Sequence, residues 1–94
     1  MRTLVFSSSF KRSFNSLIRR DPNLEAKITN RLKILVVDPF HSSLKTHKLK
    51  GKLSGVWACT IEYDCRLVFN FKKYPDSDTE EILLIDIGSH DEVY

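Results

Sequence analysis

The pattern of hydrophobic positions in the first forty residues predicts a strand followed by two helices. Residues 3–7 alternate well enough for a short opening strand. Apolar side chains then recur at helical spacing in two stripes: Phe10, Phe14, Leu17 and Ile18, then Leu24, Ile28, Leu32, Leu35 and Val36. Asp21-Pro22 ends the first helix and begins the second, with Asp21 as N-cap and Pro22 at the first helical position. The second helix should end at Asp38-Pro39, since the residue before proline avoids the helical region.

From residue 56 onward the pattern has the two-residue period of strands. Residues 56–61 and 66–71 alternate, and a tight connection at Glu62-Tyr63-Asp64 joins them. Residues 74–78 form a turn cluster. Residues 80–87 are apolar on both faces at the centre, which predicts a strand in the interior of the sheet.

Residues 40–52 lie between the helical half and the strand half, and we interpret them as a loop. They contain no acid and carry the most one-sided charge run of the chain. Its histidines and lysines are His41, Lys45, His47, Lys48, Lys50 and Lys52. Gly51 and Gly55 mark its exit into the strands.

Strand alternation predicts which side chains meet the helices. The set expected to face the helices is Trp57, Cys59, Ile61, Leu67, Phe69 and Phe71. Thr60, Arg66 and Asn70 then face the other way. The predicted fold is therefore α+β: an N-terminal helical hairpin packed on one face of a small, mainly antiparallel β-sheet. Two helices can cover only one face, so the face that carries Arg66 is expected to stay open.

Composition narrows the class of protein. A chain of 94 residues forms one domain, here residues 1–94. The net charge of +3 permits an anionic partner such as nucleic acid. No apolar run is long enough to span a membrane and the N-terminus lacks a signal-peptide pattern, so we expect a cytoplasmic protein. Cys59 and Cys65 do not have zinc-ligand spacing; we expect reduced thiols, with a cross-hairpin disulfide as the less favoured alternative.

The candidate chemistry lies where polar residues interrupt the apolar pattern. Asp64 and Arg66 stand at the strand connection, while His90 and Tyr94 follow Gly88, the glycine that ends the last strand. An acid–base pair, an arginine and a tyrosine beside a basic loop suit cleavage of RNA. The 2′-hydroxyl must lose a proton, the 5′-oxygen must gain one, and charge on phosphorus must be stabilised. RNA supplies its own nucleophile, so neither a metal nor a cofactor is required.

Each of these residues also has a simpler interpretation. Asp64 can be a turn former, and Arg66 can pair across strands with Glu80 or Glu81. The loop histidines and lysines can be solvated, and the last seven residues can be a solvent-exposed tail. Residue chemistry alone therefore predicts a small basic α+β domain with a candidate face for an anionic ligand.

Taken together, the motifs carry a resemblance to a known family. They are His47-Lys48-Leu49-Lys50-Gly51, Asp64-Cys65-Arg66-Leu67-Val68-Phe69 and Gly88-Ser89-His90-Asp91-Glu92-Val93-Tyr94. Their order and spacing resemble the RelE/ParE superfamily of bacterial toxins, most closely its YafQ branch, over nearly the whole chain.

This resemblance implies an endonuclease that cuts messenger RNA in the A site of the 70S ribosome. It also implies a cognate antitoxin, with operator DNA contacted only through that antitoxin. The implied catalytic residues are His90, Asp64, His47, Tyr94 and Arg66. Those implied to hold the RNA backbone are Lys45, Lys48, Lys50, Lys52 and Thr60.

One position departs from the branch. A second histidine can stand four residues before the acid, and here that residue is Thr60. Threonine can hydrogen-bond a phosphate but cannot exchange a proton near neutral pH, so His90, His47 and Asp64 would share the acid–base work. Two alternative functions remain: a ParE-like inhibitor of DNA gyrase that cuts nothing, and a degenerate toxin that only binds its antitoxin.

Overall fold

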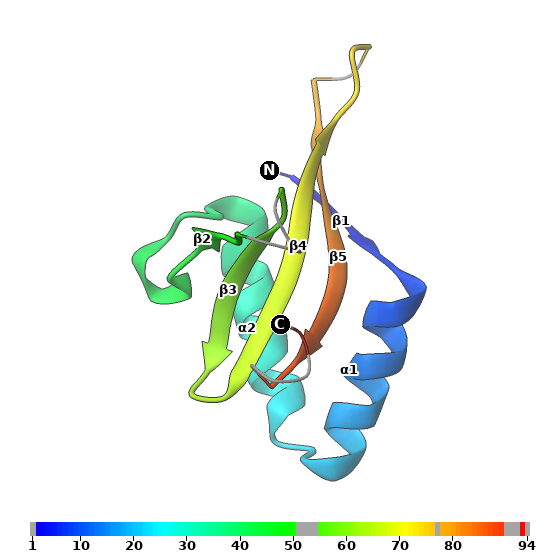
Figure 1. The fold of residues 1–94 in the computed structure, drawn as a ribbon, viewed down its shortest axis with the longest axis vertical. Coiled ribbons are helices and arrows are strands. Elements are labelled where there is room, and N and C mark those ends of the chain that lie inside the picture. Colours follow the sequence, from blue (N-terminus) through cyan, green and yellow to red (C-terminus); the bar gives the residue numbers. More distant parts are fainter. Residues whose placement is uncertain (1, 51–54, 77, 90–92, 94) are drawn as a thin grey trace.

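A computed structural model describes residues 2–50, 55–76, 78–89 and 93 (Figure 1). Within these ranges the chain runs from a first strand through two α-helices and a short 3-10 helix into four further strands. In order they are β1 (Thr3–Phe6), α1 (Ser8–Arg20), α2 (Leu24–Val37), η1 (Ser42–Leu44), β2 (His47–Lys48), β3 (Trp57–Glu62), β4 (Cys65–Lys73) and β5 (Glu80–Gly88). The predicted α+β class is confirmed.

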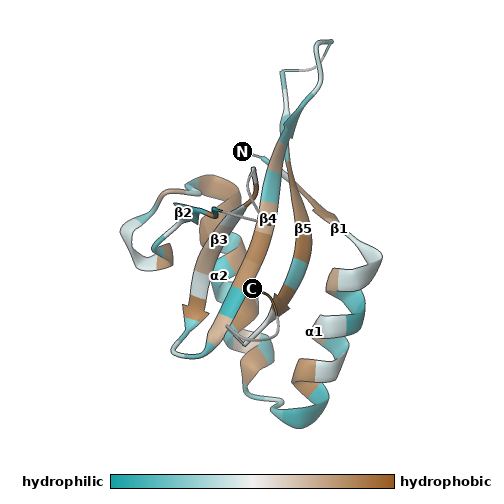
Figure 2. Ribbon diagram, viewed as in Figure 1, coloured by the Kyte–Doolittle hydropathy of each residue, from teal (hydrophilic) through white to brown (hydrophobic). Residues whose placement is uncertain are grey.

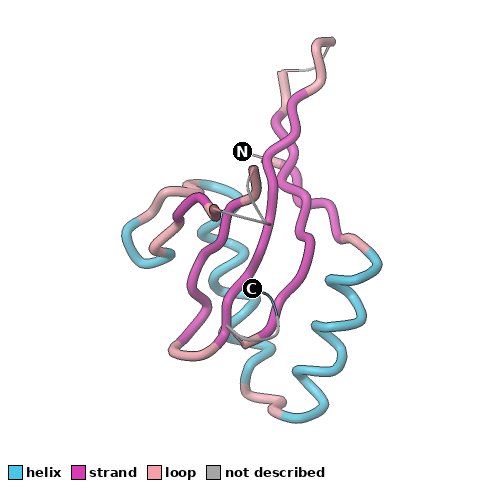
Figure 3. The backbone as a smooth tube through the Cα atoms, viewed as in Figure 1, coloured by secondary structure: helices cyan, strands magenta, loops and turns pink. Residues whose placement is uncertain are grey.

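The strands form one sheet with the order β1-β5-β4-β3-β2. β1 pairs with β5 in parallel, and every other described pair is antiparallel, so the expected mainly antiparallel sheet is confirmed. β5 lies between β1 and β4, as its apolar centre predicted. The β4–β5 hairpin projects beyond the other strands, so its tip lies at the opposite end of the sheet from the β3–β4 turn (Figure 3).

The core lies between the helices and one face of the sheet. α1 packs on β5 and α2 on β3. The helices contribute Phe10, Leu17, Ile28 and Leu35 among others, and the strand residues that meet them include Cys59, Ile61, Leu67, Phe69, Ile82 and Leu84. Trp57 and Phe71 pack against this core while half-buried. The predicted helix-facing set is therefore confirmed, and Figure 2 shows the apolar residues concentrated in the strands.

A β-bulge in β5 fastens α1 to the centre of the sheet. Val68 is aligned with Asp86 but Phe69 with Leu84, so Ile85 is one residue extra on β5. The hydroxyls of Ser7 and Ser9 donate to the carbonyl oxygen of Ile85, at 2.9 Å and 2.6 Å. Ser7 Oγ also accepts from the Phe10 N–H at 3.0 Å, which makes Ser7 the N-cap of α1.

Two local predictions were wrong. The second helix begins at Leu24 rather than at Pro22, because the Asp21 carboxylate accepts the Asn23 N–H at 3.2 Å in a turn that precedes the helix. The basic segment expected to be a loop contains η1 and the two-residue strand β2, which pairs with the start of β3. The pattern rule could not detect a strand of this length, since two residues show no alternation.

Cys59 and Cys65 are both free thiols in the core. Cys59 is aligned with Leu67 and Cys65 with Glu62, so the two cysteines are not cross-strand partners. Burial raises the pKa of Cys59 to about 12. None of the described helices is long and apolar enough to cross a membrane.

The raised pKa of Cys59 predicts a loss of stability in alkali. The unfolded chain releases this proton near the ordinary thiol pKa of about 8.5–9, whereas the folded chain retains it up to about 12. Unfolding is therefore favoured as pH rises above about 9. Between pH 8 and pH 10.5 the parent should lose about 2 kcal/mol more free energy of unfolding than Cys59→Ala. Denaturant titrations of both proteins at the two pH values test this, and parallel losses would contradict it.

Candidate functional site

The β3–β4 turn carries Asp64 at one end of the sheet. Glu62 and Cys65 are aligned across the hairpin, which leaves Tyr63 and Asp64 as the two turn residues, and both are exposed. Just before the turn the register shifts: Thr60 is aligned with Arg66, so Ile61 is one residue extra on β3. This second bulge turns Glu62 toward the helices, where it meets Lys27 of α2.

Arg66 braces this turn from within β4. Its Nη1 donates to the carbonyl oxygens of Glu62 at 3.1 Å and Tyr63 at 3.0 Å. The alternative pairing of Arg66 with Glu80 or Glu81 is wrong. Glu80 lies at the other end of β5, aligned with Lys73 and bonded to Arg2.

Arg66 also belongs to a cross-strand row near the turn end of the sheet. Its Cα is aligned with Thr60 on β3 and with Gly88 on β5. Aligned residues of paired strands share a face, so the end of β5 reaches the same place as Thr60 and Arg66.

Two cations of α2 hold the end of β3 from the helix side. Lys27 Nζ lies 2.7 Å from a Glu62 carboxylate oxygen, and Arg31 Nε donates to the Ile61 carbonyl oxygen at 3.2 Å. The hydrogen bond and charge of Glu62 raise the pKa of Lys27. The end of β3, which leads into the turn that carries Asp64, is thus bonded to side chains from both faces of the sheet.

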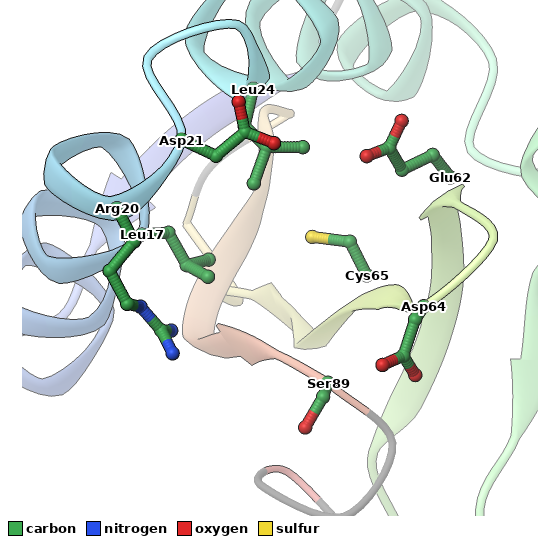
Figure 4. Close-up of a pocket in the computed structure, with 8 residues that line it drawn as sticks. All are labelled: Leu17, Arg20, Asp21, Leu24, Glu62, Asp64, Cys65 and Ser89. Carbon is green, nitrogen blue, oxygen red and sulfur yellow. The ribbon is translucent and has the colours of Figure 1, made fainter.

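A pocket of about 280 Å³ opens beside this turn (Figure 4). Its lining combines apolar side chains with charged and polar ones: Leu17, Arg20, Asp21, Leu24, Glu62, Asp64, Cys65 and Ser89. Asp64 and Ser89 approach it from the same side, while Arg20 reaches toward it from the end of α1. Ser89 is the residue before His90, so the tail begins at the rim of the pocket that Asp64 lines.

His47 lies on the same sheet face but at a distance from the turn. It is aligned with Ala58 at the edge of the sheet, and its Nδ1 lies 3.0 Å from the Lys45 carbonyl oxygen. Strand spacing and rise place its Cα roughly 12 Å from that of Arg66. His47 is exposed.

The basic segment divides between the two faces of the sheet. Lys48 is aligned with Trp57, a helix-facing residue, and its Nζ stands 5.5 Å from the centroid of the indole ring. This cation–π contact places Lys48 away from the face of His47 and Arg66. Lys45, with a left-handed φ of 51°, and Lys50 are exposed.

The face opposite the helices is less open than predicted. Ala58 and Val68 point to it, yet their exposed fractions are 0% and 3%. Thr60, Arg66 and Asn70 on the same face are half-buried. The expectation of a fully open face is therefore corrected: its centre is closed.

Three predicted site residues, Lys52, His90 and Tyr94, lie outside the described residues. Sequence reasoning did not find Arg20, Lys27 or Arg31 as part of the site. Helical periodicity predicts that such cations face solvent. Only the side of the helix on which they lie, which faces the β3–β4 turn, could have distinguished them from other surface cations. In the described ranges, no three His, Cys, Asp or Glu side chains gather closely enough to hold a metal ion.

Two helices on one face of a mixed sheet of this strand order form the fold of toxins of the RelE/ParE superfamily. The chain belongs to the YafQ family: the model for the bacterial toxin of type II toxin–antitoxin systems, YafQ, matches residues 2–94. It is thus the toxin of such a system by family.

Solved structures agree with this assignment. A YoeB/ParE toxin from Agrobacterium tumefaciens superimposes with a TM-score of 0.77 at 23% identity, covering 94% of this chain and 98% of that one. YafQ from E. coli strain BL21(DE3) gives 0.75 at 18% identity over 100% and 99%. A metal-bound toxin from Helicobacter pylori gives 0.72 at 28% identity over 100% of both chains. No curated protein sequence matches the chain.

Removing the arginine brace should loosen the turn. Arg66→Ala deletes both bonds to the turn carbonyls and is expected to lower the free energy of unfolding by about 1–3 kcal/mol. Denaturant titration measures this loss, with Arg12→Ala on the exposed surface of α1 as the matched control. Equal stability of the two variants would show that the bonds of Arg66 contribute nothing to the fold.

Proposed function

We propose that this toxin is an endoribonuclease that cleaves messenger RNA at the ribosomal A site by metal-independent acid–base catalysis. One observation carries the proposal. Asp64, Arg66 and the end of β5 gather at one end of the sheet, where Gly88 is aligned with Arg66 and Ser89 lines the same pocket as Asp64. The next residue in the chain is His90.

The proposed reaction needs three groups in reach of one phosphate. A base takes the proton of the 2′-hydroxyl, the 2′-oxygen bonds to phosphorus, and the bond to the 5′-oxygen breaks as His90 protonates it. A 2′,3′-cyclic phosphate and a 5′-hydroxyl result. Arg66 stabilises the charge that develops on the phosphoryl oxygens. Tyr94 orients the scissile phosphate or stacks on a base.

Asp64 fits the role of base better than His47. Asp64 shares a pocket with the residue before His90, whereas His47 lies on an edge strand, roughly 12 Å from Arg66 between Cα atoms. His47 and the lysines Lys45, Lys50 and Lys52 instead fit contacts with the RNA or ribosomal RNA backbone. Thr60, aligned with Arg66, can donate a hydrogen bond to a phosphate oxygen.

The proposed partners are a cognate antitoxin, messenger RNA and the 70S ribosome, in the cytoplasm. The structure of an E. coli DinJ–YafQ toxin–antitoxin complex supports the antitoxin; its YafQ covers 99% of this chain at a TM-score of 0.73. Contact with operator DNA would occur only through the antitoxin.

Loss of the proposed general acid should abolish toxicity. His90→Ala, expressed without antitoxin, should neither arrest growth nor cleave message, because the proposed reaction assigns protonation of the 5′-oxygen to His90. His41→Ala is the matched control: His41 is an exposed histidine before η1, bonded to Ser43, and its loss should leave cleavage unchanged. Primer extension on translated and untranslated messages measures cleavage.

An active His90→Ala variant would overturn the catalytic assignment. Growth arrest without cleaved message, together with inhibited DNA supercoiling by gyrase, would instead place the protein with the gyrase inhibitors.

Truncation separates the site from the fold. A chain that ends at Ser89 keeps every element from β1 to β5, so its denaturant midpoint should stay close to that of the parent. Its cleavage activity should be lost together with His90 and Tyr94. A truncated chain that still arrests growth would exclude the tail from the site.

A further inference from the structure

Tyr63 is the most exposed of the large apolar side chains on the described surface. Its exposed fraction is 95%, against 51% for Tyr74 and 57% for Phe40. A tyrosine ring usually buries a large part of its surface or finds a partner for its hydroxyl. Here nearly the whole ring is presented to solvent, one residue before Asp64.

The backbone under this ring is held firmly. Arg66 restrains the turn, since its Nη1 donates to the carbonyl oxygens of both Glu62 and Tyr63. The preceding residues are bonded to Lys27 and Arg31. An aromatic side chain with two rotatable bonds on a fixed turn loses little conformational entropy when a planar partner covers it.

The charges around the ring indicate which part of RNA it would meet. The Asp64 carboxylate follows Tyr63 directly in the chain and disfavours a phosphate against the ring itself, whereas the Glu62 carboxylate is paired with Lys27 on the helix side. Arg66, on the other side of the turn, favours a phosphate there. An uncharged nucleobase beside a phosphate fits this division: the base on Tyr63, the phosphate toward Arg66.

We propose that Tyr63 is a substrate-binding residue that stacks on a nucleobase adjacent to the scissile phosphate. This inference rests on the proposed ribonuclease function. Stacking is tolerant of sequence, because every base presents a π-face, so Tyr63 contributes affinity rather than a choice of codon. A protein partner is the competing occupant of an exposed aromatic side chain, and the test separates the two.

The test compares three variants in a translation reaction programmed with a defined message. Tyr63→Ala should raise the toxin concentration needed for half-maximal cleavage about 5- to 150-fold, the range found when a stacking aromatic residue is removed. Tyr63→Phe keeps the ring and should stay within about 2-fold of the parent. Tyr74→Ala removes a half-exposed tyrosine that directly follows the far end of β4, and it should also stay within about 2-fold. Denaturant midpoints verify that all three variants fold.

Three outcomes overturn the stacking role while leaving the proposed function intact. The first is that Tyr63→Ala cleaves message as well as the parent does. The second is that Tyr63→Phe loses as much cleavage activity as Tyr63→Ala, which would assign the effect to the hydroxyl. The third is that Tyr63→Ala retains cleavage but no longer binds the antitoxin, which would assign the ring to a protein partner. A parent that cleaves no message is a different result, because it overturns the ribonuclease function itself.

Discussion

The position of β5 is the constraint on which the rest of the structure depends. This last strand is bonded to β4 on one side and to β1 on the other, although β1 is at the opposite end of the chain. The Ile85 carbonyl oxygen in its bulge accepts the hydroxyls of Ser7 and Ser9, and Asp86 accepts that of Ser13. The first helix therefore cannot take its place without β5. Because β5 is interior, its last residue, Gly88, and the following Ser89 emerge beside Arg66 and Asp64 rather than at an edge.

Much of this arrangement could be predicted from the sequence, because the helix-facing side chains follow simple periods. Phe10, Leu17 and Ile28 mark the helix stripes, and Leu67 and Phe69 the strand alternation, and all are buried. The two bulges could not be predicted, since the extra residue in each is an ordinary strand residue, Ile61 or Ile85. They explain why Leu84 and Ile87, three residues apart, both face the core. They also explain why Glu62 reaches Lys27.

The candidate site was predictable in its residue types but not in its bonding. Asp64 and Arg66 interrupt apolar pattern, so the sequence could identify them. It could not show that the Arg66 guanidinium is bonded to the turn carbonyls, since that depends on the bulge at Ile61. Nor could it place Lys48 over Trp57, which required the register of a two-residue strand.

The bonds of Arg66 bear on how the proposed site would handle charge. An arginine whose Nη1 already donates to two backbone carbonyls is held in one orientation before substrate arrives, so little ordering is left for the moment of reaction. Thr60 stands beside it in the same cross-strand row and can add a hydrogen bond without titrating near neutral pH. In the proposed reaction, proton transfer would be assigned to groups outside that row: Asp64 on the turn, and His90, the residue after Ser89 in the chain. In the proposed site, the arginine held in the sheet would position the phosphate, while the acid and the base would be supplied by residues outside the strands.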